Sequence, residues 1–328
     1  MCKEKRRFFT GIALLVIMFM STGWIERAQA QKKYPSEAIE IIVPYNPGGA
    51  TDLSARIMAD YMSKKWGVAI NIVNKPAGVR VPACLELYSA KPDGYTLLQD
   101  GMGSSAQLPA AVKNLPFKIM DRTFIAIFAD TPTVYVVRPD SPIKTMKDVE
   151  AEVKKDPSSF TWNSLGGAGS YDHAMRKFLK AIGIDIMKTK PVVVKGGAEG
   201  VSLTAAGTVK LGLATFSSAA PSLGAKIIRS VAITTNKRNP NFPNIPTVVE
   251  EGYPTATQAD RYGPVGPPNL PSHIVEVWEK ALEEMIKDPE VIKKLERIGC
   301  APLYQNARET RERVAKELEE IRDLYGLK

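Results

Sequence analysis

Two glycine-rich segments contain the residue types that could bind an anion. They are Val43-Pro44-Tyr45-Asn46-Pro47-Gly48-Gly49-Ala50-Thr51-Asp52 and Asn163-Ser164-Leu165-Gly166-Gly167-Ala168-Gly169-Ser170. Each segment follows a predicted strand and precedes a predicted helix. Glycine lets a ligand approach the backbone closely, and the free N–H groups at a helix start attract negative charge. The pair predicts an anion site; a tight bend with Thr51 or Asp52 as a helix cap is the alternative for the first segment.

Nucleotide and hydrolase sites fit the sequence poorly. In the second segment the third glycine of G-x-G-x-x-G would fall at Asp172, and the chain has neither a G-x-x-x-x-G-K-[ST] segment nor a G-x-S-x-G elbow. Ser170, Asp172 and His173 are too close together on one helix to form a catalytic triad. We therefore expect no enzyme. We expect His173 to be a packed or capping histidine, with a place beside the ligand as the alternative.

The composition favours a small-molecule site over several other classes. Three Cys and two His in 328 residues leave no C-x-x-C pair, no disulfide scaffold and little material for a metal site. The 44 basic residues against 35 acidic ones give a formal net charge of +9, and these charges are dispersed. Dispersed charge without interleaved aromatic residues predicts no nucleic-acid partner, whereas mild positive charge suits an anionic ligand. We expect no cofactor and no metal.

The first thirty residues have the pattern of an export signal. A basic segment at 3–7 precedes an apolar run that begins at Phe8, and Ala28-Gln29-Ala30 supplies the small-x-small cleavage pattern. A retained membrane anchor from Phe8 to Ile25 is the alternative. We predict a signal peptide at 1–30, cleavage after Ala30 and a periplasmic location. The remaining chain would carry 39 basic and 33 acidic residues, a net charge of +6.

Strands and helices are predicted to alternate along the rest of the chain, which indicates parallel or mixed sheets flanked by helices. The predicted strands are 39–43, 68–73, 96–98, 123–128, 133–137, 159–163, 191–194, 210–214 and 227–234. The predicted helices are 53–65, 83–90, 145–155, 171–182, 198–206, 219–224, 271–286, 289–297 and 308–325. The proline-rich stretch 239–271 is expected to be irregular. The chain length favours two domains over one.

Two further patterns concern packing. The last predicted helix carries Val314, Leu318, Ile321 and Tyr325 on one face, which predicts a docking face onto the core. The cysteines at 84 and 300 lie in unrelated elements, so each is expected to be buried singly rather than to form a disulfide.

Six segments in order resemble a known family. They are Ile41 to Asp52, Asn74-Lys75-Pro76, Lys91-Pro92-Asp93-Gly94-Tyr95-Thr96-Leu97-Leu98, Ser164 to His173, Lys195-Gly196-Gly197-Ala198 and Asn244-Ile245-Pro246-Thr247-Val248-Val249-Glu250-Glu251-Gly252. Over residues 34–302 the chain is similar to the receptors of tripartite tricarboxylate transporters, which are also called Bug-type extracytoplasmic solute-binding proteins.

The resemblance implies an α/β, two-domain periplasmic binding protein of the Venus-flytrap, type II-like kind. Domain 1 would comprise 31–134 and 247–328 and domain 2 would comprise 135–246, with two crossing strands and a ligand cleft between them. The implied role is to capture a small organic acid by its carboxylate and to deliver it to the membrane permease subunits of a tripartite tricarboxylate-type transporter. A monomer is expected. One alternative is a ligand sensor that presents its closed form to a signalling partner, and another is an exported α/β enzyme with His173 as base.

The family motifs also imply which residues bind the ligand. They are Tyr45, Asn46, Gly48, Gly49, Thr51, Asp52, Ser104 and Ser105 from domain 1, and Ser164, Gly166, Gly167, Gly169, Ser170, His173, Lys195, Gly196, Gly197, Thr215 and Phe216 from domain 2. In this arrangement two helix starts would supply N–H donors to a desolvated carboxylate without a buried cation.

The chain departs from the family pattern in three places. Where a glycine-rich run is usual, it has Ala77-Gly78-Val79-Arg80-Val81-Pro82. We expect this loop to be stiffer and Arg80 to be a solvated surface residue, with a charge directed at the cleft as the alternative. Acidic residues common in the family are missing at Lys210 and Ala214, and Tyr262 replaces a common tryptophan. The missing acids favour a plain carboxylate ligand over an amino acid or an amide.

Overall fold

The computed structural model of the protein describes residues 34–101, 103–167, 169–239 and 242–326. The chain divides into Met1–Ser36 and Glu37–Lys328, and the fold given below is that of the second unit. The predicted signal peptide and its cleavage site lie outside the described residues. Within the described ranges, no helix combines the length and the apolar character needed to cross a membrane.

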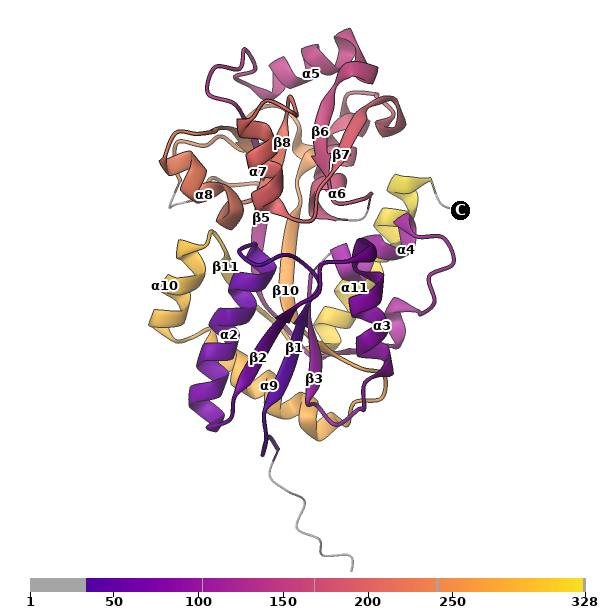
Figure 1. Cartoon of the computed structure of the whole chain (residues 1–328), viewed down its shortest axis with the longest axis vertical. Helices are drawn as coiled ribbons and strands as arrows, with labels where there is room; N and C mark the ends of the chain where they lie inside the picture. Colours follow the sequence, from indigo (N-terminus) through magenta and orange to yellow (C-terminus); the bar gives the residue numbers. More distant parts are fainter. Residues whose placement is uncertain (1–33, 102, 168, 240–241, 327–328) are drawn as a thin grey trace, which may run out of the picture. The chain divides into compact units, whose positions relative to one another are not determined.

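Three parallel strands, part of a larger mixed sheet, form the first half of this unit. β1 (Ile39–Val43) lies between β2 (Ile70–Asn74) and β3 (Thr96–Asp100), and both pairings are parallel. The isoleucine and valine side chains of β1 are all buried, as is typical of a strand covered on both faces. α2 (Ala50–Trp66) and α3 (Val81–Ser89) connect these strands and lie beside them in Figure 1. We call this group, together with the C-terminal helices, lobe 1.

Two long antiparallel strands connect lobe 1 with the rest of the unit. β5 (Ile127–Val137) pairs with β10 (Ala259–Gly266) through its first half, and β10 continues alongside β3. From Thr133 onward β5 pairs instead with β8 (Gly212–Thr215) and β9 (Arg229–Ile233). The prediction of separate strands at 123–128 and 133–137 was wrong. The ladder with β10 carries the strand through Ala129, Asp130 and Pro132, which are unfavourable in strands, and β4 is only Thr123–Phe124.

The second group of elements surrounds the far end of β5. β6 (Thr161–Ser164) and β7 (Lys190–Val193) pair in parallel, and they precede β8 and β9 in the sequence. The helices around these strands are α5 (Met146–Lys155), α6 (Ser170–Ala181), α7 (Gly197–Ala205) and α8 (Phe216–Gly224). We call this group lobe 2 (Figure 1). The mixed sheets with flanking helices confirm the predicted α/β fold class.

Each lobe has its own hydrophobic cluster. The lobe 1 cluster includes Ile42 and Leu98, and the lobe 2 cluster includes Trp162 and Phe178. Tyr253 belongs to the lobe 2 cluster, where its ring meets that of Phe178 edge-on with centroids 5.0 Å apart. Residues near 253 were assigned to domain 1 by the boundary at 246/247. Their packing favours a boundary nearer the start of β10, although the domain limits themselves stay a prediction.

The C-terminal part of the chain packs against lobe 1. Its elements are α9 (Ser272–Met285), α10 (Pro289–Arg297), β11 (Ala301–Gln305) and α11 (Ala307–Tyr325). The docking face predicted for α11 is confirmed, since Val314 and Ile321 are buried and Leu318 packs against the lobe 1 cluster. The sequence analysis missed β10 because this strand lies inside the proline-rich stretch. It also missed β11. Cys84 and Cys300 are both buried and free, as predicted.

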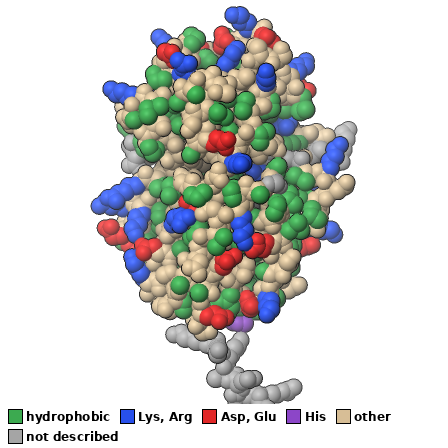
Figure 2. Space-filling model, viewed as in Figure 1, with side chains coloured by type: hydrophobic (Ala, Val, Ile, Leu, Met, Phe, Trp, Pro, Cys, Tyr) green, Lys and Arg blue, Asp and Glu red, His purple; other side chains and the backbone are tan. Residues whose placement is uncertain are grey.

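Charged side chains are mixed on the surface of the unit. Figure 2 shows basic and acidic groups interspersed over the visible face of both lobes. This matches the dispersed charge of the sequence, and it leaves the positive potential of any anion site to local backbone geometry and individual side chains.

The close passage of β10 past the chain between β4 and β5 generates a stability prediction. A Cβ on Gly263 would lie 1.7 Å from the carbonyl oxygen of Ala126, which is backbone and cannot move aside easily. Gly263→Ala should therefore lower the free energy of unfolding by about 3 kcal/mol or more. Urea unfolding measures this. Gly224→Ala is the control, because no described atom lies within 4 Å of its new Cβ. Equal midpoints for the two variants would contradict the close packing.

Candidate functional site

Four helices from the two lobes begin at one cavity. α2 begins at Ala50, α6 at Ser170, α7 at Gly197, and α8 directly after its N-cap Thr215. All four of these residues line a cavity with a volume of about 40 Å³. Helix starts carry partial positive charge and free N–H groups, so their convergence favours an anion.

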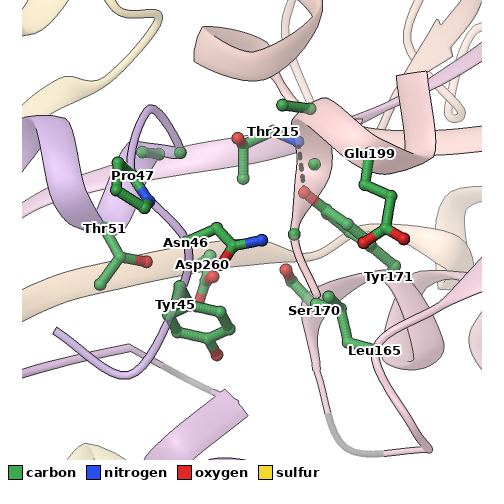
Figure 3. A pocket seen from close by; sticks show the side chains of 15 residues that line it. Tyr45, Asn46, Pro47, Thr51, Leu165, Ser170, Tyr171, Glu199, Thr215 and Asp260 are labelled. Atoms are coloured by element: carbon green, nitrogen blue, oxygen red, sulfur yellow. Dashed lines mark hydrogen bonds between the residues drawn. The ribbon is translucent and has the colours of Figure 1, made fainter. Parts of the chain in front are cut away.

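The cavity lies between the lobes and combines helix starts with polar side chains. Figure 3 shows the lobe 1 residues facing those of lobe 2 across the space. The lining residues are Tyr45, Asn46, Pro47, Gly49, Ala50 and Thr51 from lobe 1, Leu165, Ser170, Tyr171, Gly196, Gly197, Ala198, Glu199 and Thr215 from lobe 2, and Asp260 from β10. Backbone N–H groups, hydroxyls and an amide are therefore available to a small polar ligand from both sides.

Glycine at the start of α7 permits close packing in the cavity wall. A Cβ on Gly197 would lie 2.4 Å from Ser218 Oγ and 2.5 Å from Tyr171 Oη. The Thr215 N–H donates to Tyr171 Oη at 3.2 Å (Figure 3), and Thr215 Oγ1 lies 3.1 Å from Ser218 Oγ. Burial raises the pKa of Tyr171 to about 12. Its hydroxyl therefore stays protonated at neutral pH and remains a hydrogen-bond donor.

Two acidic residues also line the cavity. Asp260 is 4% exposed and projects from β10. Glu199 accepts a hydrogen bond from the Lys195 N–H at 2.8 Å, which ties the residue before the N-cap Gly196 to the first turn of α7. Neither acid was anticipated from the sequence, which had suggested that acids were missing because of Lys210 and Ala214. Carboxylates at these positions can accept hydrogen bonds from a hydroxyl or ammonium group of a ligand.

Asp52 holds the first glycine turn (residues 43–49) against α2. Its carboxylate accepts hydrogen bonds from the Gly48 N–H at 2.9 Å, from Asn74 Nδ2 at 2.9 Å and from Arg56 Nε at 3.0 Å. Asn74 also donates to the Tyr45 carbonyl at 3.0 Å, which ties the neighbouring strand end to the turn. Burial alone would raise the pKa of Asp52, but these hydrogen bonds outweigh it and hold the pKa below its usual value.

Asp172 plays the same part in the second glycine turn (residues 164–167 and 169). It accepts hydrogen bonds from the Ser164 hydroxyl, from the Leu165 N–H at 2.9 Å and from the Gly167 N–H at 3.1 Å. The Gly166 N–H donates to Ser164 Oγ at 3.0 Å. Burial raises the pKa of Asp172 despite these bonds. The N–H groups of the turn are thus used inside the turn, and the N–H groups of the following helix are left for the cavity.

The structure brings together part of the predicted ligand-binding set. The residues that line the cavity are Tyr45, Asn46, Gly49, Thr51, Ser170, Gly196, Gly197 and Thr215. The residues placed elsewhere are Gly48, Asp52, Ser105, Ser164, Gly166, Gly167, Gly169, His173, Lys195 and Phe216. The side chain of Ser104 lies outside the described part of the chain.

The residues placed elsewhere have other partners. The Ser105 hydroxyl donates to Asp100 beside a second cavity, and Lys195 is exposed. The ring of Phe216 packs on Phe242 with centroids 3.9 Å apart. Gly169 is required by packing, because its Cβ would lie 2.5 Å from Leu165 Cδ1. None of these four residues lines the cavity.

Arg80 is not the solvated surface residue that the sequence analysis expected. Its side chain is buried, with 4% of the residue exposed. Nη1 donates to the Leu165 carbonyl at 3.4 Å, and Cζ lies 5.4 Å from the centroid of the Tyr45 ring. Leu165 and Tyr45 both line the cavity, so the guanidinium contacts two residues of the cavity wall. The family-like glycine run is replaced by a turn that places this charge inside the protein.

A family model described as "Tripartite tricarboxylate transporter family receptor" matches residues 54–325. The chain belongs to this family. A UPF0065 protein of Bordetella pertussis is 31% identical over 270 residues, which cover 82% of each chain.

Solved structures agree with this family assignment. A structure described as a periplasmic transporter has a TM-score of 0.84 and 30% identity, and covers 90% of this chain and 98% of its own. MatC of Rhodopseudomonas palustris, solved with bound malate, has a TM-score of 0.82 at 22% identity, covering 89% of this chain and all of its own. The likeness to MatC shows the fold, which is that of the periplasmic binding proteins.

Several cavity residues of this family member were missed by the sequence analysis. They are Pro47, Ala50, Leu165, Tyr171, Ala198, Glu199 and Asp260. All except Asp260 lie within or next to the quoted motifs, so their places beside the motif glycines could have indicated them. Asp260 had no such signal, because it lies in the proline-rich stretch that was expected to be irregular.

His173 does not line the cavity between the lobes. It lines a separate, charged groove with Lys177 and Glu317. It is buried, its Nδ1 has no hydrogen-bond partner among the described residues, and burial with help from Lys177 and Arg176 lowers its pKa to about 3. The alternative in which His173 acts as a base on a bound substrate therefore finds no support in the geometry.

The buried His173 predicts acid sensitivity. Its pKa is about 3 in the folded protein and 6.5 for the free side chain, so the unfolded chain binds the proton more readily. Stability is therefore unaffected above pH 6.5 and falls as the pH drops from 6.5 towards 3. Between pH 7 and pH 5 this loss should be about 2 kcal/mol. His173→Gln should remove it, as measured by urea unfolding at both pH values.

The matched control is the second histidine of the chain. His273 is exposed on α9, so His273→Gln should leave the loss between pH 7 and pH 5 unchanged. If His173→Gln retained the full loss, another group would be responsible and the interpretation of His173 would fail.

Proposed function

We propose that this chain is a periplasmic solute-binding receptor that captures a small organic acid by its carboxylate and delivers it to a tripartite tricarboxylate-type permease. The observation that carries the proposal is the convergence of four helix starts on one cavity between two lobes. Membership of the receptor family supports the role. A structural neighbour solved with malate, MatC, has the same fold.

The proposed carboxylate contacts come from both lobes. In lobe 1 they are the N–H groups at the start of α2 and the side chains of Asn46 and Thr51. In lobe 2 they are the N–H groups at the starts of α6 and α7 and the hydroxyls of Ser170 and Tyr171. A desolvated carboxylate needs several donors, and hydrogen bonds to a charged group contribute about 1.5–3 kcal/mol each. Asp52, Ser164 and Asp172 act indirectly in this proposal by holding the turns.

Closure is proposed to follow from this division of contacts. A ligand stabilises the closed arrangement only through contacts that the open one lacks. Because lobe 1 and lobe 2 each supply part of the carboxylate site, both sets engage together only when the lobes meet. β5 and β10 are the strands shared by the lobes, which makes them the proposed hinge.

Asp260 and Glu199 widen the range of acids to be considered. The sequence favoured a plain carboxylate because acids were missing at Lys210 and Ala214. With two carboxylates in the cavity lining, a hydroxyl or ammonium group beside the ligand carboxylate would also find an acceptor. Hydroxy acids and amino acids therefore belong in the same screen as simple acids.

The proposed function predicts a selective thermal shift. The purified full-length chain is tested against acids, hydroxy acids, amino acids and the corresponding amides. A ligand at 100 times its dissociation constant should add about 2.7 kcal/mol of stability, which is readily detected. Gly197→Ala should abolish the shift, because its Cβ would displace the Tyr171 and Ser218 hydroxyls. Gly224→Ala, remote from the cavity, should retain it. Binding of amides but not acids by the wild type would contradict the proposal.

Delivery to a permease predicts loss of uptake. Source cells that lack this chain should take up the identified acid at a rate at least about tenfold lower, and the wild-type gene should restore uptake whereas Gly197→Ala should not. The uptake rate is measured with the radiolabelled acid. Normal uptake together with a lost transcriptional response to the acid would favour the sensor alternative instead.

A further inference from the structure

A strained turn places Arg80 beside the cavity. Val79 has a φ of 51° and Arg80 a φ of 72°, so two consecutive residues with side chains occupy the left-handed region. A β-branched residue such as Val79 rarely adopts this conformation. The turn also lies close to the opposite lobe, since a Cβ on Gly166 would lie 3.3 Å from Val79 Cγ2. Lobe 1 therefore presents Arg80 directly to the second glycine turn.

The guanidinium of Arg80 is only partly satisfied. Nη1 has a long hydrogen bond of 3.4 Å to the Leu165 carbonyl, whereas Nε and Nη2 are buried without a hydrogen-bond partner in the described part of the chain. Asp172 attracts the charge of Arg80, and this attraction partly offsets the rise that burial causes in the pKa of Asp172. Its oxygens already accept hydrogen bonds from Ser164, from the Leu165 N–H and from the Gly167 N–H.

The two unsatisfied nitrogens form one edge of the guanidinium. Nε–H and the adjacent Nη2–H are parallel donors, and this edge matches the two oxygens of a carboxylate. Burying such donors without an acceptor is unfavourable. An anionic group at this edge would remove that penalty. The guanidinium contacts Tyr45 and Leu165, which both line the cavity, so it lies directly behind the cavity wall.

We propose that Arg80 binds a second anionic group of the ligand, so that the protein selects diacids over monoacids of equal chain length. This inference rests on the proposed function and deepens it. The helix starts provide one anion site without a formal charge, and Arg80 provides a second site with one. Its hydrogen bond to Leu165 reaches from lobe 1 to lobe 2, so the second anionic group would also bridge the lobes.

The test compares matched acids on matched variants. Calorimetry measures the binding of succinate against butyrate and of adipate against hexanoate to the full-length chain. The wild type should prefer the diacid of each pair by roughly 10–100-fold. Arg80→Gln should lower diacid affinity by that factor and change monoacid affinity by less than about threefold. Arg80→Lys should give an intermediate diacid affinity, because it keeps the charge and loses the paired donors.

The control removes an equal charge elsewhere. Arg308→Gln on the exposed face of α11, where Arg308 pairs with Glu312 at 2.9 Å, should preserve the diacid preference. Equal losses for diacids and monoacids in Arg80→Gln, or no diacid preference in the wild type, would overturn the inference and leave the receptor role standing. If Arg80→Gln did not fold, Arg80→Lys and the wild-type preference would decide. Absence of binding by every acid would instead refute the proposed function.

Discussion

The geometry of the cavity depends on a buried aspartate at the third position of two helices. Asp52 in α2 and Asp172 in α6 each turn back to accept N–H groups from the glycine turn that precedes the helix. A buried carboxylate is tolerable only when donors surround it, and the turn supplies them because Gly48 and Gly167 adopt φ values of 88° and 84°. These hydrogen bonds hold each turn against the start of its helix, and the first residues of both helices line the space between the lobes.

The two aspartates reach this result in different electrostatic settings. Asp52 has Arg56 as a direct partner and keeps a pKa below the usual value, whereas the pKa of Asp172 is raised. The second turn is also where lobe 1 touches lobe 2 beyond the cavity: Tyr325 Oη donates to the Gly167 carbonyl at 3.1 Å and Arg80 donates to the Leu165 carbonyl. The same short segment therefore takes part in the proposed ligand site, in lobe contact and in the burial of a charge.

The sequence predicted most elements and the general place of the site, because hydrophobic periodicity and glycine motifs are local signals. It failed where long-range pairing decides the outcome. β10 forms within a proline-rich stretch because β3 and β5 pair with it on either side. This strand places Asp260 in the cavity lining, which no local sequence pattern predicted. The burial of Arg80 could not be predicted either, because it depends on a contact with Leu165, which lies 85 positions further along the chain. The motif glycines were located correctly, but local spacing could not distinguish a glycine facing the cavity from one bonded within its own turn.

The pairing of β5 with β10 has a consequence for how such proteins can diversify. Thr131 in β5 lies opposite Asp260 in β10, so the chain leaves lobe 1 and returns to it at adjacent backbone positions. Everything between these positions forms a cassette whose two ends are already joined by a sheet ladder. Exchange of that cassette between relatives would replace three of the four helix starts at once while keeping the lobe 1 core. The C-terminal end of α11 and the turn that carries Arg80 would then have to change in step, because Tyr325 and Arg80 both contact the second glycine turn.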